Sequence, residues 1–94
     1  MTFFIPRTNV IESDAGYSVE VLGRVGLRYT EGSRILHIDS EVLAGPSGLI
    51  VYSDSIKPET PSDSLEPIDP SEKTRIIENI RAAFRFRGIE IQVA

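Results

Sequence analysis

The chain has 94 residues, which is enough for one domain with a single core and too few for two. It has no cysteine, so disulfides, thiolate catalysis and sulfur-rich metal sites are excluded. Its formal net charge of −4 argues against a protein that follows nucleic-acid phosphates, because such proteins cluster Lys and Arg.

The first residues carry a short apolar cluster, Phe3-Phe4-Ile5. No basic segment precedes it and it is too short for a signal peptide, which favours a cytoplasmic location. No apolar stretch in the chain approaches the length of a membrane span, so we expect no membrane contact. The cluster is compatible with an additional edge strand or with a segment folded across the sheet.

Four segments after the first polar turn have the patterns of β-strands. Residues 17–22 and 25–30 alternate apolar and polar side chains, which predicts two strands with one buried face each. Residues 34–39 form a third candidate, and the apolar run at residues 49–52 forms a fourth.

A capped helix is predicted over about residues 70–87. Asp69 is placed to cap it, Pro70 occupies the first helical position, Glu72 stands three residues after the cap and Gly88 ends the helix. One apolar stripe recurs at helical spacing and can lie on a sheet. Its members are Ile76, Ile77, Ile80, Ala83 and Phe84.

The last residues alternate again, and residues 89–93 are predicted to return to the sheet as a final strand. Together the elements predict one α+β domain over residues 1–94. Its sheet is expected to be mostly antiparallel with four to six strands. One C-terminal helix packs on one face. Phe86 lies off the apolar stripe and is expected either to cap a second cluster or to remain exposed as a partner contact, with packing favoured.

A polar connection, residues 53–69, separates the fourth strand from the helix. It holds one cation, Lys57, and its carboxylates are Asp54, Glu59, Asp63, Glu66 and Asp69. Three prolines stiffen it, and Tyr52 leads directly into it. A connection this long in so small a domain is usually functional or disordered. Composition alone makes a solvated loop and a binding surface equally credible.

Candidates for catalysis are few. His37 is the only histidine, and it could act as a base with Asp39 or Glu20 as the orienting carboxylate. A partly exposed strand histidine without a chemical role is the favoured interpretation. The carboxylates of the acidic connection match no calcium-binding loop, and Gly45-Pro46-Ser47-Gly48 lacks the lysine of a phosphate-binding loop. We therefore expect no enzyme, metal or cofactor.

Two motifs support a family assignment, Tyr52-Ser53-Asp54-Ser55-Ile56-Lys57 and Glu66-Pro67-Ile68. They are followed by Glu72-Lys73 at the start of an Ile-rich helix and by Gly88-Ile89-Glu90-Ile91. From about Gly16 onward this order resembles the immunity protein 74 family of bacterial polymorphic toxin systems. The resemblance implies a small, mostly cytoplasmic, non-enzymatic protein that binds and silences a cognate toxin.

The resemblance and the charge pattern suggest one mechanism, in which the acidic connection enters a basic cleft of the toxin. The partner expected is thus a toxin domain with a basic surface, and neither nucleic acid nor a membrane. The residues expected at the contact are Tyr52, Asp54, Lys57, Glu59, Asp63 and Glu66. Two alternatives are an enzyme centred on His37 and an adaptor whose exposed sheet edge pairs with a partner strand.

Overall fold

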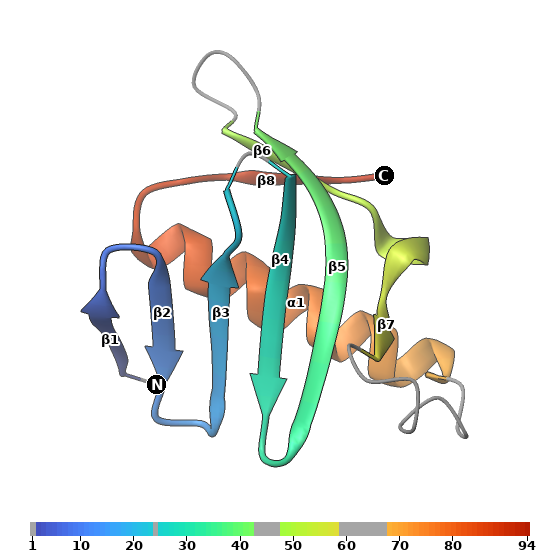
Figure 1. Cartoon of the computed structure of the whole chain (residues 1–94), viewed down its shortest axis with the longest axis horizontal. Helices are drawn as coiled ribbons and strands as arrows, with labels where there is room; N and C mark the ends of the chain where they lie inside the picture. Colours follow the sequence, from blue (N-terminus) through green and yellow to red (C-terminus); the bar gives the residue numbers. More distant parts are fainter. Residues whose placement is uncertain (1, 24, 43–47, 59–67) are drawn as a thin grey trace.

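The fold comes from a computed structural model that describes residues 2–23, 25–42, 48–58 and 68–94. Five strands follow one another as an antiparallel meander (Figure 1). They are β1 (Phe3–Arg7), β2 (Val10–Ser13), β3 (Tyr17–Val21), β4 (Val25–Glu31) and β5 (Arg34–Val42).

The second half of the chain extends this meander and covers one of its faces. Its elements are β6 (Leu49–Val51), the 3-10 helix η1 (Ser53–Ser55), β7 (Lys57–Pro58), α1 (Pro70–Phe86) and β8 (Ile91–Val93). β6 and β7 both pair antiparallel with β5, whereas β8 pairs parallel with β6. Within the described residues the strands form one eight-stranded sheet, in the order β1-β2-β3-β4-β5-β6-β8 with β7 beside β5.

The predicted α+β class, with one helix and a final strand, is confirmed, but the predicted sheet is wrong. The sheet is mixed and larger than a mostly antiparallel sheet of four to six strands. Phe3, Phe4 and Ile5 belong to an edge strand, β1, which a proline interrupts and whose pattern is therefore weak. β8 is parallel to β6 because the helix carries the chain back across the sheet between the two strands.

The helix begins and ends as its sequence predicts. The Asp69 carboxylate accepts a hydrogen bond from the Glu72 N–H at 2.8 Å, which lowers the pKa of Asp69. At the other end, Gly88 has a φ of 77°, and the N–H of Ile89 donates to the Phe84 carbonyl at 2.9 Å. These bonds form the turn that commonly closes a helix with glycine.

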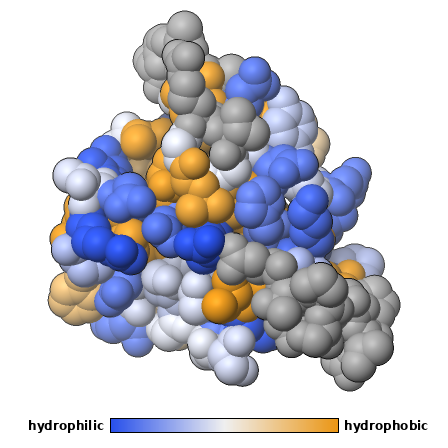
Figure 2. Space-filling view, in the orientation of Figure 1, coloured by the Kyte–Doolittle hydropathy of each residue, from blue (hydrophilic) through white to orange (hydrophobic). Residues whose placement is uncertain are grey.

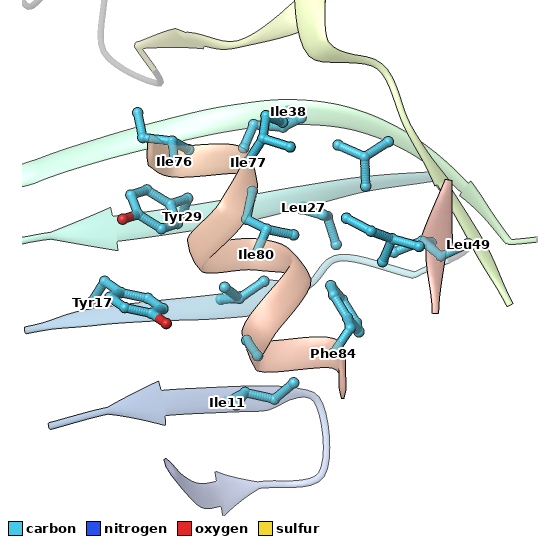
Figure 3. Packing of buried hydrophobic residues seen from close by; sticks show 14 of the residues in the cluster. Ile11, Tyr17, Leu27, Tyr29, Ile38, Leu49, Ile76, Ile77, Ile80 and Phe84 are labelled. Carbon is cyan, nitrogen blue, oxygen red and sulfur yellow. The ribbon is translucent and has the colours of Figure 1, made fainter. Parts of the chain in front are cut away.

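The core lies between α1 and one face of the sheet. Every member of the predicted helix stripe is buried, and Figure 3 shows this stripe facing the strands that carry Leu27 and Tyr29. Leu27, Tyr29 and Ile38 are completely buried, as are Ile76 and Ile80 on the helix. Burial of these apolar side chains is the main force that holds the two layers together.

A hydrogen-bond network of polar side chains joins the helix to β4 beside this core. The Tyr29 hydroxyl donates to Glu31 Oε1 at 2.8 Å and accepts from Asn79 Nδ2 at 2.9 Å. Arg75 Nη1 donates to both carboxylate oxygens of Glu31, at 2.8 and 2.7 Å. Burial opposes ionisation of Glu31, but the bonds from Arg75 and Tyr29 outweigh it, so the pKa of Glu31 lies below its usual value.

The N-terminal hairpin β1–β2 docks on the end of the helix. The Phe86 ring is half exposed and lies 5.3 Å from the Phe3 ring, which in turn meets Tyr17 edge-on at 6.4 Å. Arg87 Nη1 donates to the Thr8 carbonyl at 2.6 Å. Phe86 therefore combines features of both predicted alternatives, because its ring contacts Phe3 while half of its surface is exposed.

The opposite face of the sheet is free of the helix. Figure 2 shows this face, with apolar side chains among hydrophilic ones. None of the helices in the described ranges has the length and apolar character that a membrane crossing requires.

Candidate functional site

The candidate site is the η1 segment, residues 52–58, which follows β6 and runs back along β5. The Tyr52 N–H donates to the Asp39 carbonyl at 3.0 Å as the segment begins. At its end, Lys57 and Pro58 lie opposite His37 and Leu36 in the register of β7 with β5. Both ends of the segment are thus attached to the same strand.

Two serines hold the middle of the segment in place. The Ser53 N–H and hydroxyl both donate to the Ala94 carbonyl, at 3.0 and 2.9 Å. The Ser55 hydroxyl donates to the Tyr52 carbonyl at 2.6 Å and accepts from the Asp39 N–H at 2.7 Å. These bonds fasten η1 to β5 on one side and to the residue after β8 on the other.

The other residues of the segment face solvent. Tyr52, Asp54 and Lys57 are exposed, whereas Ser53 and Ser55 are partly buried between them. The Asp54 side chain has 93% of its surface exposed. The segment therefore divides into serines that fix the backbone and three predicted contact residues that this backbone presents.

Neighbouring elements supply two further charged groups. The Tyr52 hydroxyl donates to Glu41 Oε2 at 3.0 Å, and this bond to a carboxylate raises the pKa of Tyr52. Lys73, in the first turn of α1, donates to Asp54 Oδ1 at 2.6 Å and lowers the pKa of Asp54. Both pairs are exposed to solvent, so they contribute little to folding. They orient Tyr52 and Asp54.

The predicted contact residues are thus partly placed. The structure brings Tyr52, Asp54 and Lys57 together on one segment, and the predicted residues Glu59, Asp63 and Glu66 lie outside the described residues. Sequence reasoning missed Glu41 and Lys73. Glu41 stands beyond the predicted end of its strand. The inward-facing residue before it, Ser40, is polar, so the apolar alternation in the sequence stops short of Glu41.

His37 lies beside this segment on the helix-free face of the sheet. It pairs with Arg28 on β4 and with Lys57 on β7. Its Nδ1 atom is buried, has no hydrogen-bond partner in the described part of the chain and lies 3.7 Å from Asp39 Oδ1. The alternative carboxylate, Glu20, instead accepts from Arg28 at 2.9 Å.

The serines near His37 are engaged elsewhere. The Ser40 hydroxyl accepts from the Gly26 N–H at 3.1 Å, and the Ser55 hydroxyl bonds the backbone as described above. Across residues 2–23, 25–42, 48–58 and 68–94, no three His, Asp or Glu side chains gather as metal ligands do. Within the described ranges, neither Ser40 nor Ser55 is therefore placed as a hydroxyl for His37 to activate.

The sheet edge formed by β1 is poorly suited to strand addition. Its register with β2 shifts between Phe4 and Arg7, and Pro6 in that interval has no N–H to donate. Proline and bulges on an edge strand prevent pairing with other chains. The adaptor alternative therefore gains no support from this edge.

A small α+β domain that presents aromatic and charged side chains from a fixed turn has the features of a protein-binding module. The model of the family described as Immunity protein 74 matches residues 19–94, and the chain belongs to this family. The resemblance drawn from the sequence is confirmed. No curated protein and no solved structure matches the chain.

Family membership indicates the general role of the protein. It indicates an immunity protein directed against a protein toxin, with a non-enzymatic role. The match contains the whole η1 segment and all of α1, whereas β1 and β2 precede it.

Proposed function

We propose that this protein binds a cognate toxin of a bacterial polymorphic toxin system and neutralises it by covering its active site. The reaction chemistry belongs to the toxin, and the immunity protein makes and breaks no covalent bond. The proposed partner is a toxin domain with a basic surface, bound in the cytoplasm without nucleic acid or a membrane.

The observation that carries this proposal is the fixed backbone of the η1 segment. A binding segment that is already ordered loses less conformational entropy when a partner docks, so more of the contact energy appears as affinity. The bonds of Ser53 and Ser55 supply that order. Tyr52 then serves as a rigid aromatic anchor, of the kind that dominates many interfaces.

Charge supports the basic character of the partner. Asp54 and Glu41 are exposed on or beside the segment, and the sequence continues with Glu59, Asp63 and Glu66. Clustered negative charge attracts a basic surface over several ångströms and raises the association rate, while desolvated anchors set the dissociation rate. We include all six predicted residues in the proposed contact, with Glu41 added beside Tyr52.

The test uses the toxin module that this proposal expects a neighbouring gene to encode, with binding kinetics measured at about 50 and 300 mM salt. The variant D54N/E59Q/D63N should associate more slowly and show a weaker salt dependence than the wild type. The matched control E12Q/E78Q/E90Q removes the same number of charges from exposed positions outside residues 52–69, and it should behave more like the wild type.

A separate variant tests the anchor. Y52A should weaken the complex by about tenfold or more, mainly through faster dissociation. Unchanged rates and salt dependence in both the charge variant and Y52A would show that neither the η1 segment nor the acidic connection that follows it is the contact surface. Failure of co-expressed wild-type protein to protect cells from the module would contradict the proposed function itself.

A further inference from the structure

We propose that His37 is a proton-sensitive element of the binding surface, coupled through Asp39 to the backbone that holds the η1 segment. The inference rests on the proposed function only where it concerns toxin affinity. Histidine is the side chain that ordinarily changes charge between pH 5 and 8. His37 is the only one in the chain and lies beside the proposed contact residues.

The His37 ring lies against the backbone of β4. β4 has a register shift between Val25 and Leu27, and Gly26, inside it, has a φ of 100°. A Cβ atom at Gly26 would lie 3.1 Å from His37 Nε2. The ring therefore occupies space that the missing side chain leaves open, which places Nδ1 in a buried position near Asp39.

Four charged side chains surround the His37 ring or its neighbours. Arg28 faces it from β4 and Lys57 from β7, and both oppose a positive charge on His37. Asp39, on β5 itself, favours that charge. Glu20 on β3 accepts from Arg28 at 2.9 Å and so offsets part of its repulsion.

Protonation of His37 would change its contact with Asp39. At 3.7 Å, Nδ1 and Asp39 Oδ1 are too far apart for a hydrogen bond. A protonated ring donates from both nitrogens, and a charge-assisted bond would draw the two atoms together by roughly 1 Å. The Asp39 carboxylate is thus expected to move when His37 gains a proton.

The backbone of Asp39 is bonded directly to the η1 segment. The Asp39 N–H donates to the Ser55 hydroxyl at 2.7 Å, and the Asp39 carbonyl accepts from the Tyr52 N–H at 3.0 Å. A shift of Asp39 therefore acts directly on the two residues that fix and begin the segment. Protonation also adds positive charge to a surface proposed to bind a basic partner. By linkage, affinity for that partner should fall as the pH falls.

The coupling can be tested on the protein alone by nuclear magnetic resonance between pH 8 and 5. The backbone amides of Asp39, Tyr52 and Ser55 should shift with the same midpoint as the single His37 ring, while the amide of Gly16 serves as a distant reference. The variant H37Q should remove this transition from the three amides. The variant D39N should leave the ring titrating and reduce the response at Tyr52 and Ser55.

Ring titration without movement of these amides, or the same movement in H37Q, would overturn the coupling. The second measurement is the affinity for the adjacent toxin module at pH 7.5 and pH 5.5. Wild-type affinity should fall by about fivefold or more, and H37Q should lose less. Equal losses in both proteins would overturn the effect on affinity. Absence of binding at both pH values would contradict the proposed function, while the amide shifts still decide the coupling.

Discussion

Ser55 shows how one side chain can shape a binding surface without facing a partner. Its hydroxyl bonds the Tyr52 carbonyl and the Asp39 N–H, so it joins the start of the η1 segment to β5. Serine provides one donor and two acceptor positions on a short stem, which suits a position between two backbone groups. The presented residues on either side of it depend on these bonds for their direction.

Replacing Ser55 with alanine should destabilise the fold by about 1–2 kcal/mol, because the Asp39 N–H and the Tyr52 carbonyl lose a partly buried partner. Urea denaturation measures the loss, and faster amide exchange at Asp39 locates it. S33A is the control, because Ser33 is exposed in the turn between β4 and β5. Similar stability of the two variants would mean that the hydroxyl does not hold the segment.

Tyr29 is a core residue whose hydroxyl links two elements, as the Ser55 hydroxyl does near the surface. From its environment we expect the stability of the protein to depend on pH in the alkaline range. Burial raises the pKa of Tyr29 above the unfolded value of about 10, and Glu31 adds to this effect. The folded state therefore holds the proton more tightly. The resulting stabilisation is complete below about pH 10 and is lost as the pH rises above that value.

Y29F should be less stable than the wild type by about 1–2 kcal/mol at pH 8, because Asn79 and Glu31 lose a bonding partner. The difference between the two proteins should narrow as the pH passes 10. Urea midpoints measured at pH 8, 9.5 and 10.5 give both quantities. A constant difference across this range would show that the Tyr29 hydroxyl does not govern the alkaline response.

At the scale of elements, the register shift in β4 links the sheet to the η1 segment. Gly26 donates to the buried Ser40 hydroxyl at 3.1 Å and leaves room for the His37 ring. Bulges commonly redirect a strand or re-aim a side chain near a functional site. In this sheet the register shift in β4 leaves space at Gly26 for the ring of His37, which lies on β5 between β4 and β7.

Alanine variants of two glycines distinguish the cost of backbone strain from the cost of crowding the His37 ring. Gly23 and Gly26 both have positive φ, at 109° and 100°, so alanine at either position should cost about 1–2 kcal/mol. An added Cβ at Gly23 meets nothing within 4 Å, whereas at Gly26 it crowds His37. G26A should therefore lose more stability than G23A in urea denaturation and should also shift the His37 ring resonances. Equal losses with unmoved resonances would contradict this description.

At the scale of the whole molecule, the N-terminal hairpin contributes to the same hydrophobic core as the family-matched region. Ile11 on β2 is 2% exposed and belongs to the hydrophobic core that α1 completes. Arg87 reaches from the end of the helix to the Thr8 carbonyl. The core therefore extends beyond residues 19–94, and stability should depend on residues that precede them.

A matched pair of isoleucines tests this dependence. I11A should destabilise the protein by about 2–5 kcal/mol, because it opens a cavity in the core. I5A removes the same atoms from β1, where the side chain is 45% exposed, and should change stability by about 0.5 kcal/mol. Both are measured by urea denaturation followed at α1 and at the hairpin. A small effect of I11A, or separate transitions for the two parts, would show that the hairpin is an appendage.

The sequence by itself determined the helix and the strands whose patterns are local. Asp69, Pro70 and Gly88 fix the ends of α1 through neighbouring backbone groups, and its apolar stripe follows from the helical period. Alternation along residues 17–22 and 25–30 likewise requires no knowledge of distant residues. The motif Tyr52-Ser53-Asp54-Ser55-Ile56-Lys57 likewise indicated the family from the sequence alone.

Only the tertiary structure decided the extent of the sheet and the arrangement of the site. The parallel pairing of β8 with β6 and the inclusion of β1 depend on contacts between residues far apart in the chain. The separate roles of Ser55 and Asp54 depend on Asp39 and Lys73, which adjoin the segment only after folding. A local pattern specifies which side chains share a face, but long-range packing specifies what that face meets.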